Sequence, residues 1–596
     1  MRFLRYLLPL FLLLTTAAWW ATQGSDSPAE QGEEQSHEPA PYPADFEERR
    51  EKVQGMTLAV NAAGELPDEL AWQDGAGEPD IGDPAAQKGG CLRVSNVGPY
   101  PANFLAFGSP APQFFHYNLF TTVELPPVAR HPQTGADIPG TAIQWAQQGN
   151  TVYFRLHPAA RYSNGRPLRA ADYVLGALLR AECGDAGFEQ LREAASALEA
   201  RGEDTLVLTL RRPLPSAAAA AALLHAAEPS FYAEFGSDYR TRYADRVPPT
   251  TGGYTLGRTE RGRMAELARV RDWWARELPY YRNRCNADSI EHHFLTDEAQ
   301  AWEFLLRGKL DLLQTRNISA WQRRLPELEA AGLRTAEFRA EYPMPPYGIA
   351  LNAEALPSAE LRRGLLLAMD MDAAVALLFC GEGERLTTFH TGYGPLTPRD
   401  TPRVSYAPDA ARAAFAAAGY ARQGEDGILR NAAGERLSVR LTYTPNDKTS
   451  ALATVLAQSA RRCGAEIVPE PVPWQQAAKQ QQEGRYQLLF WATVAPDTPA
   501  PARFFGSRAE GEDAPFRLHD AEMDALLAAY EQAEAPDARA AALAAIDRRV
   551  AELGIWLPGW KENDIRAAHT PKLHFPRAFT PALYELTETH LYWLAP

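Results

Sequence analysis

The chain has 596 residues, several times the length of a typical single domain, so it contains more than one hydrophobic core. Hydrophobic residues make up 45% and charged residues 23%, which is the balance of an ordinary globular protein and excludes a largely disordered chain. The 60 basic and 75 acidic side chains leave a formal net charge of −15. This excess argues against nucleic acid as a partner, because phosphates require clustered Lys and Arg.

The first 24 residues have the pattern of a secretory signal. Arg2 and Arg5 precede an uncharged, apolar run over residues 6–21, which ends in small side chains. This run is shorter than the roughly 20 residues that cross a bilayer comfortably, so we expect export to the periplasm. Trp19 and Trp20 obscure the cleavage site. Two fates stay open: removal of residues 1–24, or their retention as an anchor in the inner membrane.

Residues 25–88 are interpreted as an acidic linker followed by a loosely packed extension. The first part is rich in Gly, Ser, Glu, Gln and Pro, the composition of a tether. Residues 46–87 mix apolar patches with many Gly and Pro, and compact structure is predicted to begin at Gly89. The sequence leaves open whether residues 46–88 pack on the domain that follows.

The rest of the chain mixes strands and helices without strict alternation, which predicts an α/β fold with long loops. Residues 151–156 and 205–210 are β-rich and bounded by turn residues. Residues 171–181 carry one apolar helical stripe, and residues 361–379 predict one long apolar helix. Two further helical patterns lie on either side of Pro536.

Signatures of catalysis and metal binding are missing. The sequence has no GxSxG, HExxH, GxGxxG or phosphate-loop motif, and its five cysteines form no CxxC pair, so disulfide pairing stays open. Gly381 and Gly383 are interpreted as a turn that ends a helix, and Asp370 and Asp372 as residues that cap or solvate one. We therefore expect no enzyme activity, no cofactor and no metal site.

Several motifs in register resemble one known family. They are residues 153–168 with the Asn164–Gly165 turn, 171–174, 251–254, 271–274, 299–311, 351–372 and 406–430. From Gly89 to Tyr592 the chain resembles the solute-binding proteins of peptide-type ABC importers, the oligopeptide and dipeptide-binding family, and looks closest to its YejA-like subgroup. Arg169 stands where the family has a Thr helix cap, and Asp172 is expected to compensate near the helix N-terminus.

The resemblance implies an α/β, two-lobed periplasmic binding protein with mixed sheets and a hinge between the lobes. Lobe one is expected over residues 89–289, lobe two over 290–556, and a C-terminal return to lobe one over 557–596. The implied function is capture of a peptide-like ligand by a monomer that delivers it to the membrane permease of an ABC importer. Two alternatives stay open on the same fold: a membrane-tethered ligand sensor or scaffold, and a binder of a non-peptide small molecule.

The resemblance also implies ligand contacts. In relatives, a strand ending in a Trp-x-x-Asp stretch carries an aspartate that pairs with the α-amino group of the ligand. Here residues 486–491 match the strand, so Phe490 and Trp491 are candidate contacts, and Asp497 follows three residues later than in the pattern. In the first lobe, the candidates facing the cleft are Phe115, Tyr117 and Asn118. For Trp491, Phe115, Tyr117 and Asn118 the competing interpretation is packing in a core, and for Asp497 it is a place in a surface loop.

Overall fold

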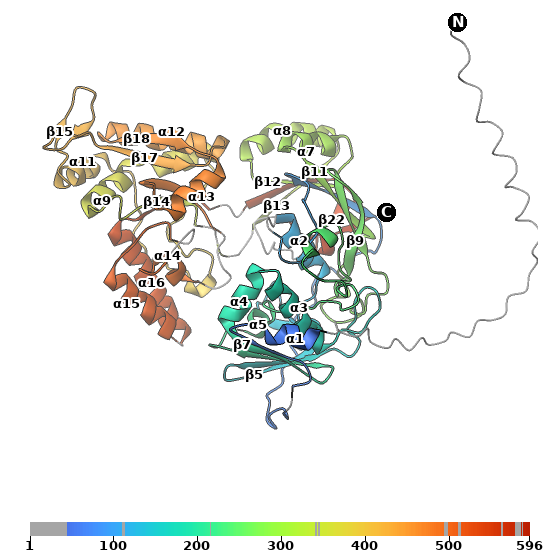
Figure 1. Cartoon of the computed structure of the whole chain (residues 1–596). Helices are drawn as coiled ribbons and strands as arrows, with labels where there is room; N and C mark the ends of the chain where they lie inside the picture. Colours follow the sequence, from blue (N-terminus) through green and yellow to red (C-terminus); the bar gives the residue numbers. More distant parts are fainter. Residues whose placement is uncertain are drawn as a thin grey trace, which may run out of the picture.

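The computed structural model describes residues 45–595 except 63, 110–113, 215, 340–342, 344–345, 494–498, 510–513, 534, 562–563, 578–585 and 587. The side chains of residues 114, 116–118 and 121 are also outside the described part. The expected signal and most of the acidic linker therefore lie outside the described residues. Figure 1 shows two lobes side by side, with the yellow-to-orange part of the chain forming one of them.

The first lobe begins with a five-stranded sheet. Its strands, in spatial order, are β1 (Thr57–Ala59), β7 (Ala195–Arg201), β8 (Thr205–Leu210), β6 (Thr151–Leu156) and β5 (Ala142–Gln148). Two helices, α3 (Ala170–Glu182) and α4 (Ala186–Ala194), pack against it. These elements confirm the strands predicted over 151–156 and 205–210 and the helix over 171–181. As expected, Asp172 compensates for the missing cap, because its carboxylate accepts a 2.9 Å hydrogen bond from the backbone N–H of Arg169.

A seven-stranded sheet completes the first lobe. Its strands, in spatial order, are β13 (Arg334–Arg339), β21 (Asp564–His569), β12 (Leu312–Thr315), β2 (Cys91–Val97), β11 (Ser289–Leu295), β10 (Met264–Arg269) and β9 (Tyr254–Glu260). The helices of this part are α2 (Phe114–Val123), α7 (Glu298–Leu306) and α8 (Ile318–Ala330).

The boundary between the lobes lies later in the chain than the sequence analysis placed it. β11 pairs in parallel with β2 along its whole length, from Ser289 opposite Cys91 to Leu295 opposite Val97. Residues 289–339 therefore belong to the sheet of the first lobe, and the second lobe begins after β13 instead of at residue 290. The return to the first lobe comes with β21, which starts at Asp564.

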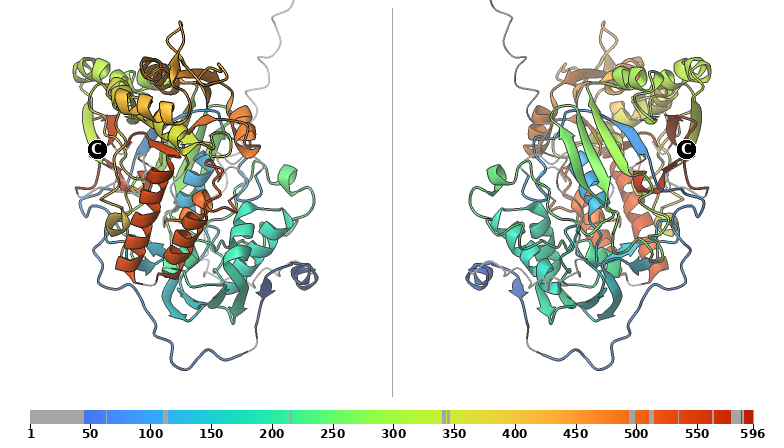
Figure 2. Two further views of the ribbon diagram at one scale, coloured as in Figure 1. Left: turned by 90° about the vertical axis from the view of Figure 1, so that its left-hand side faces the viewer. Right: turned by 90° about the vertical axis from the view of Figure 1, so that its right-hand side faces the viewer.

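The second lobe is built on a sheet in the order β18 (Glu466–Pro471), β17 (Ser438–Tyr443), β19 (Leu488–Trp491), β14 (Gly348–Leu351), β20 (Trp556–Pro558). Its helices are α9 (Ala359–Ala368), α10 (Met371–Leu378), α11 (Pro408–Ala417), α12 (Asp447–Arg462), α13 (Trp474–Gln482), α14 (Pro501–Phe505), α15 (Ala521–Gln532) and α16 (Pro536–Leu553). The helices predicted on both sides of Pro536 are confirmed as α15 and α16, which lie side by side in Figure 2.

One predicted helix is divided. The apolar run over 361–379 forms α9 and α10 instead of one helix, because Met369 has an extended backbone and Asp370 caps a new helix by accepting from the backbone N–H of Ala373. This confirms the capping interpretation of Asp370. The turn at Gly381 follows α10, as expected.

The short elements are α1 (Phe46–Glu51), β3 (Val128–Arg130), β4 (Asp137–Pro139), α5 (Ala217–Ala221), α6 (Tyr239–Arg242), β15 (Arg422–Gln423), β16 (Leu429–Arg430), β22 (Leu573–His574) and β23 (Trp593–Leu594). None of the helices in the described ranges is both long enough and apolar enough to span a bilayer. All five cysteines are free thiols in this structure.

Residues 45–88 form a strap that supplies β1, one edge strand of the five-stranded sheet, and crosses the sheet to bridge β5 at the other edge. β1 adds to the β7 edge in parallel, and Gln73 forms a bridge with Trp145 on the β5 edge. Between these points the strap packs on the outer side of the sheet, with Arg155 lying 4.4 Å from the ring centre of Trp72. Figure 2 shows the strap as the blue chain running around the base of the lobe. The bridge at Gln73 pairs backbone groups of the β5 edge that would otherwise be unpaired in the sheet.

The strap also contributes to the hydrophobic core of the first lobe. Phe46, Met56 and Leu58 are buried against the inner side chains of the sheet, and Leu58 is only 2% exposed. The structure thus answers the question that the sequence left open, since residues 46–88 pack on the first lobe.

We predict that Leu58→Ala lowers the free energy of unfolding by about 2–5 kcal/mol, because it removes buried methyl groups and leaves a cavity. Urea unfolding followed by tryptophan fluorescence measures the change. Glu69→Ala, an exposed position of the same strap, is the matched control and should stay within about 0.5 kcal/mol of the parent. An unchanged unfolding midpoint for Leu58→Ala would show that burial of this strap residue does not stabilise the first lobe.

Candidate ligand-binding site

The chain passes between the lobes over residues 340–347 and returns over residues 559–563, and we call these two segments the crossings. In the first lobe, both crossings meet the large sheet at the carboxyl ends of its parallel strands. β2, β11 and β12 run parallel to one another. β21 runs against β12, so it begins beside the carboxyl end of β12, where Thr315 pairs with Arg566. β13 runs against β21 and therefore ends at the same edge, where Arg339 pairs with Asp564.

The second lobe repeats this arrangement. β17, β18 and β19 are parallel, and β14 and β20 complete the sheet. Gly348, the first residue of β14, lies opposite both Trp491 and Pro558, the last residues of β19 and β20. The crossings therefore join the carboxyl ends of the two sheets. In open α/β sheets ligands bind outside these ends, so this region is the candidate site.

Three aromatic rings stack where the crossings enter the second lobe. Tyr347 and Trp560 have ring centres 5.4 Å apart and almost parallel planes, and Phe490 lies on Trp560 at 5.8 Å. The three rings come from the segment before β14, the segment after β20 and the end of β19. Trp560 is 2% exposed, and its indole Nε1 is buried without a hydrogen-bond partner. An unpaired buried donor of this kind costs about 1–3 kcal/mol.

Glu384 ties both crossings to the loop that follows α10. Its carboxylate accepts hydrogen bonds from Arg339 at 2.7 Å and from Lys561 at 3.0 Å. Arg339 ends β13 of the first lobe, whereas Lys561 lies on the return crossing. The hydrogen bond from Arg339, followed by that from Lys561, holds the pKa of Glu384 below its usual value.

A second glutamate of the same loop contacts the first lobe directly. Glu382 accepts hydrogen bonds from Arg566 of β21 at 3.2 Å and from Gln322 of α8 at 3.0 Å. Another ion pair between the lobes joins two exposed side chains, Arg212 and Glu531, at 4.0 Å. Polar contacts thus hold the lobes in the orientation that Figure 1 shows.

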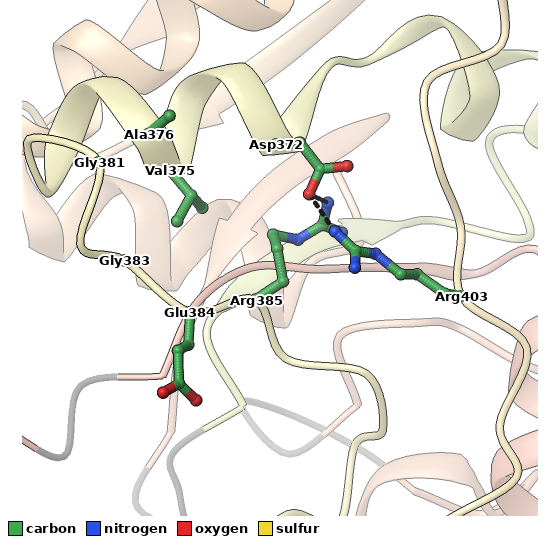
Figure 3. A pocket seen from close by; sticks show the side chains of 8 residues that line it. All are labelled: Asp372, Val375, Ala376, Gly381, Gly383, Glu384, Arg385 and Arg403. Carbon is green, nitrogen blue, oxygen red and sulfur yellow. Dashed lines mark hydrogen bonds and ion pairs between the residues drawn. The ribbon is translucent and has the colours of Figure 1, made fainter.

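A pocket of about 360 Å³ lies beside these contacts in the second lobe (Figure 3). It is lined by Asp372, Val375, Ala376, Gly381, Gly383, Glu384, Arg385 and Arg403. Arg385 donates from Nε to the carbonyl of Gly559 and from Nη2 to that of Pro558, at 3.1 and 2.8 Å. This side chain therefore belongs both to the pocket and to the return crossing.

Among the predicted ligand contacts whose side chains the structure describes, Phe490 is the one that lies at the crossings. Phe490 is half-buried in the aromatic stack, whereas Trp491 points to the opposite face of the sheet, where it packs among Phe389, Phe504 and Phe516. Adjacent residues of a strand face opposite sides, so both cannot line one surface. Trp491 is 5% exposed, which fits packing in a core.

The other predicted contacts belong to different surroundings. Phe115 of α2 is buried against His292 and Phe294 of β11, with ring centres 5.2 and 5.0 Å away. The side chains of Tyr117 and Asn118 lie outside the described part, as does Asp497. Ligand contact by all six residues stays a prediction.

Sequence reasoning missed Tyr347, Trp560, Glu384 and Arg385. Each stands in a short loop or at a strand end without a motif, and nothing in the local sequence marks the crossings. Within the described ranges, no group of three or more His, Cys, Asp or Glu side chains is placed to hold a metal ion.

Comparisons with known proteins agree with this geometry. Residues 138–514 match the family model described as bacterial extracellular solute-binding proteins, family 5, middle. The uncharacterized protein YejA of Escherichia coli strain K12 is 24% identical over 253 residues, which cover 41% of this chain and 40% of that protein. The chain thus matches less than half the length of this curated relative.

Two solved structures share the fold. The oligopeptide-binding protein AppA of Bacillus subtilis, in complex with a nonapeptide, has a TM-score of 0.67 at 16% identity and covers 86% of this chain and 100% of its own. NikA from Brucella suis, in complex with Fe(III)-EDTA, has a TM-score of 0.68 at 20% identity, covering 85% and 100%. They confirm the expected two-lobed fold. Together with the family match over residues 138–514, they establish that the chain belongs to the bacterial extracellular solute-binding proteins of family 5.

Proposed function

We propose that this protein is exported to the periplasm, where the monomer binds peptides between its lobes and delivers them to the membrane permease of an ABC importer. The observation that carries the proposal is the meeting of the carboxyl ends of both sheets at the two crossings, which makes one site with walls from both lobes. The nonapeptide held by AppA on the same fold supports a peptide as ligand. Binding without chemical conversion agrees with the family match.

The second-lobe wall of the site offers groups that a peptide requires. The ring of Phe490, stacked on Trp560, supplies an apolar surface for side chains. The unpaired indole Nε1 of Trp560 is a donor for a carbonyl group. Asp497 follows the strand that carries Phe490, and its carboxylate is suited to the α-ammonium of the peptide. Closure of the lobes excludes water and strengthens these polar contacts.

The bound ligand should be visible directly. We expect protein purified from the periplasm without denaturation to release a spread of small peptides on acid treatment, detected by native mass spectrometry before and after release. A peptide at 100 times its Kd should stabilise the emptied protein by about 2.7 kcal/mol, which a melting assay detects. A protein that carries no ligand and does not respond to any peptide pool would contradict the proposal, and release of a different molecule would identify a non-peptide binder.

We predict that Asp497→Asn weakens binding of peptides with a free amino terminus by about tenfold or more, because a charge-assisted hydrogen bond contributes about 1.5–3 kcal/mol. Isothermal titration with one defined peptide measures this loss. The same peptide with an acetylated amino terminus is the control and should bind the parent and the variant equally. Equal affinity of parent and variant for the peptide with a free amino terminus would rule out pairing of Asp497 with the α-ammonium group.

We predict that Glu384 stabilises the junction of the lobes in a pH-dependent way. Because its pKa is lowered in the folded protein, the stabilisation is present above the unfolded value of about 4.3 and is lost as the pH falls through the folded value. Glu384→Gln should therefore lower the urea midpoint at pH 7, and this difference from the parent should shrink as the pH falls below about 4.3. Glu425→Gln, an exposed substitution of the same kind, should change neither value. A pH-independent effect of Glu384→Gln would contradict this role.

A further inference from the structure

The pocket beside the crossings contains two arginines and one aspartate in contact, and the proposed function assigns no role to these three side chains. Asp372, in the first turn of α10, faces Arg385 from the loop after that helix and Arg403 from the segment before α11. Figure 3 shows the three side chains converging at one end of the pocket, with Glu384 directed away from them.

One carboxylate oxygen serves two guanidinium groups. Oδ1 of Asp372 lies 3.2 Å from Nη1 of Arg385 and 2.5 Å from Nη2 of Arg403. Glu384 does not offset the second positive charge, because its carboxylate is already paired with Arg339 and Lys561. Within ion-pair distance, the arginine end of the pocket therefore has one carboxylate for two guanidinium groups, and Asp370 acts on Arg385 from farther away, although the chain as a whole carries −15.

Burial increases the cost of this imbalance. The side chain of Arg385 is 6% exposed, and desolvation lowers its pKa, which means that the surroundings stabilise its positive charge incompletely. Arg403 is 52% exposed, and among the described residues its single charged partner is Asp372. Arg403 thus keeps further N–H donors for a group that enters from solvent.

The opposite wall leaves room for such a group. Gly381 has a left-handed backbone with φ +86°, and a Cβ added there would meet no atom within 4 Å. At Gly383 the wall is tight, since a Cβ would come within 2.6 Å of Cγ1 of Val375. A volume of about 360 Å³ falls within the range of small-molecule pockets.

We propose that this pocket binds a small carboxylic acid, whose carboxylate is held by Arg403 and Arg385 in competition with Asp372. A guanidinium group forms paired, parallel hydrogen bonds with a carboxylate, which distinguishes this anion from a simple point charge. The pocket shares Glu384 and Arg385 with the crossings, but the inference does not rest on the peptide proposal.

Isothermal titration of the protein purified from the periplasm with succinate tests the site. We expect succinate to bind the parent protein, and Arg403→Gln to weaken this binding by about tenfold or more, because a charge-assisted hydrogen bond is lost. Arg399→Gln removes the same charge from an exposed position of the same segment outside the pocket, and it should leave the affinity unchanged.

Two further measurements separate a built site from general attraction of anions. Asp372→Asn should tighten succinate binding, since it removes the internal competitor, and succinamide, the uncharged analogue, should not bind. Equal affinities of Arg403→Gln and Arg399→Gln for succinate, or binding of succinamide as strong as that of succinate, would overturn the proposal. We expect Arg403→Gln to keep the melting temperature of the parent, which shows that the variant is folded. We also expect it to release bound peptides as the parent does, which separates loss of succinate binding from failure of the proposed function.

Discussion

The direction of the strands at the two crossings is the constraint on which the rest of the structure depends. β13 ends and β21 begins at the carboxyl edge of one sheet, while β14 begins and β20 ends at the carboxyl edge of the other. A reversed direction in either sheet would place the crossings at its amino edge, and no site with two walls would form. The chain runs between the lobes from Arg339 to Gly348 and returns from Pro558 to Asp564, so both connections between the lobes are short.

The cores on both sides of the second sheet explain why neighbouring residues have different roles. Trp491 is locked among aromatic rings on the face that α14, α15 and α16 cover. Phe490, one residue earlier, must then point to the other face, where it meets Trp560. The aromatic core thus fixes the position of β19 and, through it, the orientation of the ring at the crossings. In the first lobe the strap has a similar effect, because it holds both edges of the five-stranded sheet.

Local patterns in the sequence predicted elements well, whereas contacts between distant segments could not be predicted. The strand over 151–156 and the helix that follows it are marked by alternation, a turn and an apolar stripe, all within a short stretch. The boundary at residue 290 was wrong because the pairing of β11 with β2 joins segments far apart in the chain. Trp560 and Tyr347 meet for the same reason. The break between α9 and α10 had a local signal, the capping residue Asp370, which the long apolar run concealed.

Arg385 contacts both the pocket of the second lobe and the return crossing. Its guanidinium group donates to the carbonyls of Pro558 and Gly559 and also faces Asp372, so one planar group satisfies the return crossing and the pocket together. Arg385 is buried, and it shares the carboxylate of Asp372 with Arg403. Its two hydrogen bonds to backbone carbonyls therefore contribute much of what keeps this buried cation in place.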